Sequence, residues 1–233
     1  MIYISLAHRS IYDAYTNYWS FGYGRTSRTF GMLGTPQCHT SGLRESFSTP
    51  QSHPKLTSLV LEDFTAFHTL DYDWGRVDAC FYAMGISSVG VNAEVYYSLT
   101  YDLTTVIADH LYEQNPQMVF NYVSGQGTDS SEKGALGWAR VKGKTENYIL
   151  NKGFKDAYMF RPGAIIPQKG IRSRTAWYNA VYWIMRPFFP LLLRSKNISS
   201  TTTLGLAMIQ TLRHPGDQKH LENPQINTLA ALP

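Results

Sequence analysis

The chain has 233 residues, of which 43% are hydrophobic and 16% are charged, and its formal net charge is +4. A hydrophobic fraction of this size sustains a packed core and excludes wholesale disorder. The modest positive charge permits a phosphate-bearing ligand, but no dense Lys/Arg run indicates nucleic acid. The two cysteines, Cys38 and Cys80, form no metal or disulfide pattern, which is typical of a reducing compartment. We therefore expect a cytoplasmic protein with no metal site and no nucleic-acid partner.

Residues 1–52 show neither the hydrophobic period of a strand nor that of a helix, and no strand-loop-helix unit can be drawn in them. The run FGYGRTSRTFG places Gly22 and Gly24 at the spacing of a dinucleotide-binding loop, but Ser27 stands where such a loop needs its third glycine. We expect residues 1–52 to be an atypical or poorly ordered segment and residues 53–233 to form the folded domain.

From residue 56 onward, predicted strands alternate with predicted helices. The strands are residues 56–61, 79–85, 118–125 and 157–163, and the helices are residues 92–114 and 134–151. This alternation predicts the α/β class with a doubly wound parallel sheet. Ligands of such sheets bind beyond the carboxyl ends of the strands, where Gly85, Ser124 and Arg161 stand in this sequence.

Each of the two predicted helices has apolar residues on one face, which we expect to be buried. These residues are Val95, Leu99, Leu103, Ile107 and Leu111 in the first helix, and Trp138, Val141, Thr145, Tyr148 and Ile149 in the second.

The C-terminal region, about residues 164–233, is predicted to be a helical substrate-binding or lid region. Ser200 to Thr203 form the N-cap of a helix that runs to Leu212. The most apolar stretch, residues 177–193, contains Arg186 and two prolines and is short for a membrane span. We expect it to form a buried or interfacial helix pair, as a lid or a dimer face; peripheral membrane contact is the minor alternative.

The predicted helix at residues 134–151 contains the run WARVKGKTE, in which Trp138, Lys142 and Glu146 are each four residues apart. Together with the runs HPKL, LEDF, ACFYAMGISSVG, TYDLT, YVSG, MFRPG and LEN, it resembles atypical short-chain dehydrogenases, more narrowly the NAD-dependent epimerase/dehydratase-like proteins, over about residues 53–226. The resemblance implies a Rossmann fold that binds NAD or NADP across the sheet, and a small-molecule substrate.

The resemblance also implies roles for residues at matching positions. Asp63 and Phe64 would lie at the adenine, Ala83, Met84 and Gly85 along the cofactor, and Arg161, Pro162 and Gly163 near the nicotinamide. Ser124 would be the active-site serine, and Trp138 and Lys142 take the places of the catalytic Tyr and Lys. An indole cannot exchange a proton as a phenol does, whereas Lys142 can still bind ribose. Tyr122 and Tyr148 are candidate substitutes for the phenol.

Two functions follow from these positions. The first is an oxidoreductase or epimerase that uses Ser124 and Lys142 with another proton carrier, and the second is a non-catalytic NAD(P)-binding regulator or scaffold. A purely structural reading stays open beside them, because a Trp packed beneath a Lys stem is a common pair on a helix face. Likewise, Ser124 can simply end a strand and Asp63 can be a turn residue.

The family's phosphate-binding unit is missing from residues 1–52 in the written reading frame. Read one nucleotide later, the codons of Tyr18 to Arg25 permit Ile/Thr-Gly-Ala-Ser-Gly-Met-Val-Gly, which resembles the family's phosphate loop. The same shift turns residues 30–37 and 41–46 into sequences similar to the family's first helix and second strand. We therefore expect this segment to be out of frame. In the written frame the protein would lack the phosphate loop, the central strand and its neighbour, and would be an inactive product.

Overall fold

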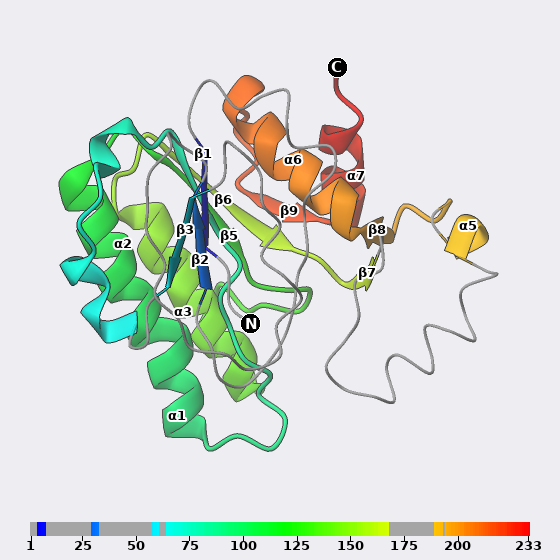
Figure 1. Ribbon diagram of the computed structural model, residues 1–233. Helices are drawn as coiled ribbons and strands as arrows, with labels where there is room; N and C mark the ends of the chain where they lie inside the picture. Colours follow the sequence, from blue (N-terminus) through cyan, green and yellow to red (C-terminus); the bar gives the residue numbers. More distant parts are fainter. Residues whose placement is uncertain (1–3, 8–28, 33–56, 61–63, 168–188, 193) are drawn as a thin grey trace.

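The computed structural model describes residues 4–7, 29–32, 57–60, 64–167, 189–192 and 194–233. Its centre is a seven-stranded sheet in the order β3-β2-β1-β4-β5-β6-β9 (Figure 1). The strands are β1 (Ile4–Ala7), β2 (Thr29–Met32), β3 (Thr57–Val60), β4 (Ala79–Tyr82), β5 (Val119–Val123), β6 (Asp156–Arg161) and β9 (His220–Glu222). A separate pair of short parallel strands, β7 (Ala164–Ile166) and β8 (Ile198–Ser200), follows the carboxyl end of β6.

Four neighbouring strands of the sheet, β4, β5, β6 and β9, are parallel. Tyr82 of β4 pairs with Tyr122 of β5, which pairs in turn with Met159 of β6. Because parallel strands have their carboxyl ends at one edge of a sheet, the segments that follow β4, β5 and β6 lie side by side. The predicted α/β, Rossmann-like fold is confirmed for this part of the chain.

The expectation that the sheet would lack its central strand and its neighbour is wrong. β1 and β2 occupy these two places, but β1 pairs with β4 in the antiparallel direction, while it is parallel to β2. A Rossmann sheet has β1 parallel to β4, so that its carboxyl end faces the ligand. Here the carboxyl end of β1 lies at the opposite edge. The residues of the expected phosphate loop, 18–25, lie outside the described part of the chain.

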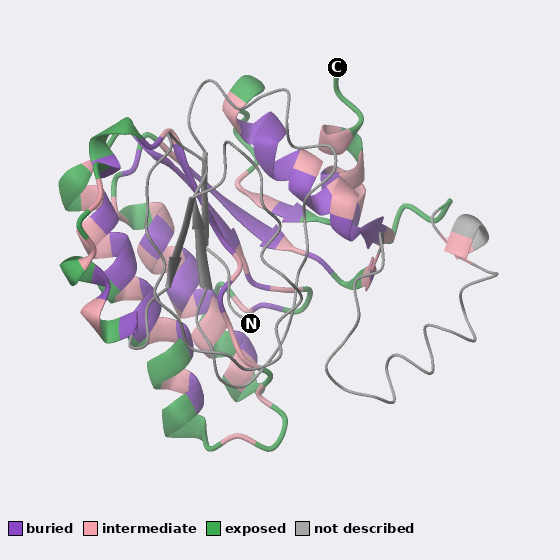
Figure 2. Cartoon of the chain, viewed as in Figure 1, coloured by how far each residue is buried: buried purple, intermediate pink, exposed green. Residues whose placement is uncertain are grey.

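Helices cover both faces of the sheet (Figure 1). On one face lie α1 (Ala93–Tyr97), the π-helical turn η5 (Ser98–Asp102), α2 (Leu103–Gln114) and α3 (Gly137–Asn151), preceded by the 3-10 turns η3 (Phe64–Thr69) and η4 (Trp74–Arg76). On the other lie α6 (Thr201–Arg213) and α7 (Asn223–Ala230). Alternate side chains of β4 point to the two faces, since Cys80 and Tyr82 belong to the core under α2 and Ala79 and Phe81 to the core under α6. Figure 2 shows β4, β5 and β6 as a mostly buried layer between the helices.

The predicted buried face of the first long helix is correct only in its second half. Leu103, Ile107 and Leu111 are buried, but Val95 is 49% and Leu99 38% exposed. The π-helical turn η5 widens the helix by about one residue, which rotates the preceding turn relative to a four-residue stripe. Tyr96 consequently takes the buried position.

The second long helix begins at Gly137, three residues later than expected. The Asp129 carboxylate accepts hydrogen bonds from the backbone N–H groups of Gly134 and Ser131, at 2.6 and 3.0 Å, and holds the preceding residues in a turn. Within this helix Thr145 and Ile149 are buried as expected, whereas Trp138, Val141 and Tyr148 are only partly buried.

Helix α6, in the C-terminal region, starts where the sequence predicted. The Ser200 hydroxyl accepts a hydrogen bond from the Thr203 N–H at 3.0 Å, and this satisfies one of the free donors of the first turn. Of the apolar stretch at residues 177–193, only α5 (Phe189–Leu192) is described. None of the helices in the described ranges has the length and hydrophobicity to cross a membrane.

Candidate functional site

Ser124 stands directly after β5, and its backbone N–H and its hydroxyl both contact other groups of the protein. Its backbone N–H donates to the Phe160 carbonyl of β6 at 2.8 Å. Its hydroxyl lies 2.5 Å from Glu146 Oε1 and 3.2 Å from the Phe160 oxygen. Because the residue is only 6% exposed, its hydroxyl is engaged within the protein rather than presented to a ligand.

Lys142 extends from α3 to the end of β5. Its Nζ donates a hydrogen bond to the Ser124 carbonyl and lies 3.5 Å from where a Cβ of Gly125 would stand. Burial lowers the pKa of Lys142, and the nearby Glu146 carboxylate acts in the opposite direction. Ser124 and Lys142 are therefore brought together, as the sequence predicted.

Glu146 is fully buried, and its carboxylate contacts several of the side chains around it. Arg161 Nε lies 3.0 and 3.2 Å from its two carboxylate oxygens, and Arg161 Nη2 forms a further ion-paired hydrogen bond with Oε2. His220 of β9 places Nε2 3.5 Å from Oε2. Burial and the Arg161 charge lower the pKa of His220, partly opposed by Glu146. The sequence pattern contained Glu146 but gave it no role; the available signal was an acidic residue one helix turn after Lys142.

Arg161, expected near a nicotinamide, directs its guanidinium toward the protein. Besides Glu146, Nη2 donates to the Ser130 hydroxyl in the loop between β5 and α3. Arg161 thereby connects the end of β6 both to α3 and to this loop, and the Glu146 carboxylate largely compensates its charge.

The loop after β5 packs against the residue pair that follows β6. Gly125 and Gly127 have φ values of +144° and +83°, which side chains rarely tolerate. The Gln126 N–H donates to the Pro162 carbonyl at 3.0 Å. A Cβ on Gly127 would lie 3.4 Å from the Trp138 ring, so the partly buried indole covers this turn.

Gly163 completes this arrangement. Its N–H donates to Asn223 Oδ1 at 2.6 Å, and a Cβ here would lie 2.3 Å from Gln126 Oε1. Gly163 thus lets the two loops approach closely. Asn223, at the start of α7, was missed by the sequence analysis because its partner lies 60 residues away.

The remaining predicted cofactor residues follow β4 or lie at the start of η3. The pairing of β4 with β5 places Ala83, Met84 and Gly85 beside the end of β5. Phe64 and Met84 are 3% and 5% exposed and belong to the core under α2. Asp63 lies outside the described residues.

The two candidate substitutes for the missing phenol are engaged by other groups. Tyr122 is 1% exposed and is bonded to Thr145, and burial raises the pKa of its phenol well above the usual value. Tyr148 donates to the Asp109 carboxylate, and burial and this contact both raise the pKa of its phenol. Neither phenol forms a hydrogen bond with Ser124 or Lys142.

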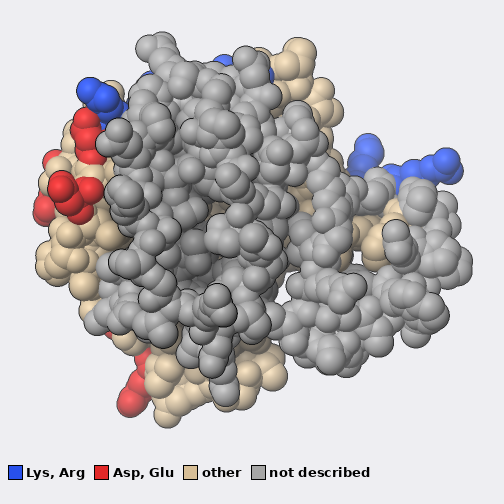
Figure 3. All heavy atoms as spheres, viewed as in Figure 1, with Lys and Arg blue, Asp and Glu red and all other residues tan. Residues whose placement is uncertain are grey.

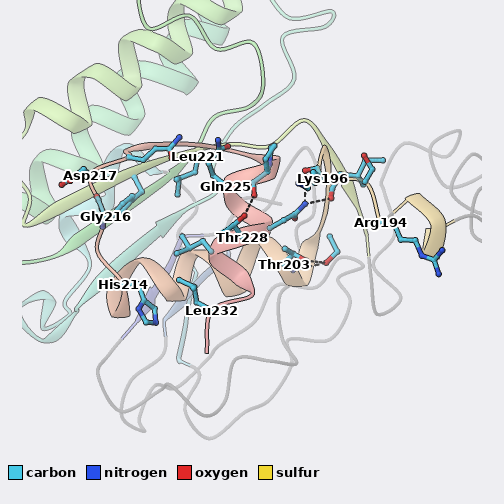
Figure 4. A pocket seen from close by; sticks show the side chains of 18 residues that line it. Arg194, Lys196, Thr203, His214, Gly216, Asp217, Leu221, Gln225, Thr228 and Leu232 are labelled. Carbon is cyan, nitrogen blue, oxygen red and sulfur yellow. Dashed lines mark hydrogen bonds between the residues drawn. The ribbon is translucent and has the colours of Figure 1, made fainter.

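A separate open groove of about 860 Å³ runs along α6 and α7. Figure 4 shows Arg194 and Lys196 toward one end and His214 and Asp217 toward the other. None of the predicted site residues is among the described side chains that line it. On the face seen in Figure 3, the described Lys and Arg side chains form no continuous basic surface.

The four parallel strands, the helices on both faces and the polar cluster at the carboxyl edge define a Rossmann-like α/β protein. No protein-family model matches the chain, and no curated protein matches it. Among solved structures, the chain is similar to UDP-glucuronic acid 4-epimerase from Bacillus cereus in complex with NAD, with a TM-score of 0.44 and 10% identity over 69% of this chain. The chain covers 55% of that epimerase. A likeness of this degree says nothing about function.

Proposed function

We propose that this protein is an atypical short-chain dehydrogenase-like protein that binds NAD(P) without the usual tyrosine-type proton transfer. One observation carries the proposal. Lys142 is held at the end of β5 against the Ser124 carbonyl, whereas the residue one helix turn earlier is Trp138. An ammonium group can donate hydrogen bonds to ribose hydroxyls, but an indole N–H cannot act as an acid and base near neutral pH.

The described residues fit the ribose-nicotinamide half of a dinucleotide. The ends of β4, β5 and β6 are adjacent, and the glycine turn after β5 brings backbone close to the Lys142 amine. A nicotinamide, when bound, would supply a hydride donor or acceptor, while Lys142 would bind the ribose and the turn would orient the ring. The pyrophosphate half lacks this support in the described residues, because β1 runs in the opposite direction. We therefore expect weaker binding than an intact phosphate loop would give.

The alternative is an oxidoreductase or epimerase acting on a small molecule. The observation in its favour is the burial of Lys142, which lowers the pKa of its amine and thus increases the neutral fraction able to accept a proton. A frame-shifted, inactive product is the third candidate. Sequencing the transcript across codons 1–55 tests it, since an intact phosphate-loop reading would restore the missing unit.

The proposal is tested by titrating the purified protein with NADPH and NADH and following the fluorescence of the reduced nicotinamide. Lys142→Ala should weaken binding roughly tenfold, because a charged hydrogen bond to the ligand is lost. Lys144→Ala is the matched control: Lys144 lies on the same helix but donates to the Tyr97 hydroxyl at 2.6 Å. Equal affinities for the wild type and the Lys142 variant would contradict the proposal.

A further inference from the structure

A fully buried carboxylate without a direct ligand role lies behind the site. We propose that Glu146 is a positioning residue: it fixes Ser124 at the end of β5, and Ser124 in turn holds the Lys142 amine where ribose binds. The identity of the ligand rests on the proposed function, whereas the chain of contacts from Glu146 to Lys142 does not.

The contacts that lead from Glu146 to Lys142 run through Ser124. The Ser124 hydroxyl lies 2.5 Å from Glu146 Oε1, and the Ser124 carbonyl accepts from Lys142 Nζ. The Ser124 N–H is bonded to Phe160 at 2.8 Å, so all three polar groups of Ser124 are engaged. If the hydroxyl loses Glu146, it keeps only its longer 3.2 Å contact with the Phe160 oxygen, and the carbonyl that orients Lys142 is held less firmly.

The carboxylate itself is held from two further elements. Arg161 approaches from β6 and His220 from β9, while Lys142, on the same helix, interacts with it through its charge. The Glu146 side chain is 0% exposed and that of Arg161 is 13% exposed. A buried carboxylate needs such a partner, because desolvation opposes its charge. Arg161 contacts both carboxylate oxygens and so keeps Glu146 in place, while Oε1 also accepts a hydrogen bond from the Ser124 hydroxyl.

Glu146 also acts on Lys142 through its charge. Burial lowers the pKa of the Lys142 amine, and the carboxylate opposes this shift. Removing this charge shifts the titration of Lys142 whatever the role of Ser124. The titration therefore tests whether the two charged groups lie close together, and the ligand affinity of Ser124→Ala tests the path through Ser124.

The first measurement needs no ligand. Lysines are reductively methylated with a 13C label, and the Lys142 signal is assigned from its absence in Lys142→Arg. In Glu146→Gln, which keeps the side-chain volume, Lys142 should titrate at lower pH than in the wild type, because burial is then unopposed. Asn151→Ala is the control: it lies on the same helix, and its side chain bonds the Asn147 carbonyl at 2.8 Å. Lys142 titrating alike in the wild type and Glu146→Gln would overturn the proposal.

The second measurement is NADPH affinity. Glu146→Gln and Ser124→Ala should each weaken binding about tenfold, while Asn151→Ala should bind as the wild type does. If Glu146→Gln does not fold, the double variant Glu146→Met with Arg161→Met removes both charges and takes its place in both measurements. A wild type that binds no dinucleotide contradicts the proposed function, and the Lys142 titration still tests whether the Glu146 carboxylate acts on Lys142. Full affinity in Ser124→Ala and in the Glu146 variant overturns the positioning role and leaves the proposed function standing.

Discussion

We expect Gly143→Ala to displace the loop between β5 and α3, which borders the site, and so to destabilise the protein. Gly143 lies in the middle of α3, where the loop after β5 crosses the helix. A Cβ at this position would stand 1.8 Å from the Asp129 carbonyl oxygen, 2.4 Å from its carbon and 3.1 Å from the Ser130 nitrogen. All three are backbone atoms, so no flexible side chain can turn aside. The loop itself must move away from the helix.

The size of the effect follows from the contacts that such a movement breaks. The Asp129 N–H donates to the Ala139 carbonyl at 3.1 Å, and Asn147 Nδ2 donates to the Ser130 carbonyl at 2.9 Å. Overpacking costs about 1–3 kcal/mol, and each lost hydrogen bond about 1 kcal/mol. The higher helix propensity of Ala returns at most about 1 kcal/mol. We expect the free energy of unfolding to fall by about 2–4 kcal/mol.

Urea denaturation followed by tryptophan fluorescence measures this change. Gly137→Ala is the matched control, because it lies on the same helix and its Cβ would come no closer than 3.8 Å to Arg140 Nη2. The control should be within about 0.5 kcal/mol of the wild type. Equal stabilities for the two alanine variants would refute the account of how this loop is held.

Three further outcomes follow from the site and the core. Trp138→Tyr should gain hydride transfer between NADP and small secondary alcohols, with Trp138→Phe as the inactive control; no gain would mean that this position does not correspond to a catalytic tyrosine. Arg161→Met should destabilise the protein by about 3–5 kcal/mol because Glu146 stays buried and unpaired, whereas Arg161→Met with Glu146→Met should recover most of it; a double variant as unstable as the single one argues against the pair. Burial raises the pKa values of Cys80 and Tyr122, so the folded state keeps protons that the unfolded chain releases. The free energy of unfolding should therefore fall above about pH 9, by up to about 1.4 kcal/mol per pH unit for each group, and Cys80→Ala should reduce the slope. A constant stability from pH 8 to pH 11 would contradict this.

The parallel part of the fold could be predicted from the sequence because its signals are local. The runs that became β4, β5 and β6 are mostly apolar segments, and a polar or glycine residue lies at or shortly after the end of each. Ser200 marked the start of α6 for the same reason, since a hydroxyl before an apolar period is an N-cap signal. The meeting of Ser124 with Lys142 followed from the resemblance and the expected order of strands.

The features that the sequence did not predict depend on contacts between residues that are far apart in the chain. Arg161 is 15 residues from Glu146 in the sequence, and only the packing of β6 against α3 brings them together. The π-helical turn η5 has no sequence signal of its own, and it moved Val95 and Leu99 to the surface. The reversed direction of β1 could not be predicted either, because short apolar runs do not encode the direction in which they pair.

The central claim is that a dinucleotide binds at the carboxyl ends of β4, β5 and β6 and that Lys142 takes part. Amide hydrogen exchange with and without saturating NADPH tests it most directly. The account predicts slower exchange at residues 83–85, 124–127 and 161–163, and loss of this protection in Lys142→Ala at the same NADPH concentration. Unchanged exchange throughout, or protection confined to the groove along α6 and α7, would contradict it.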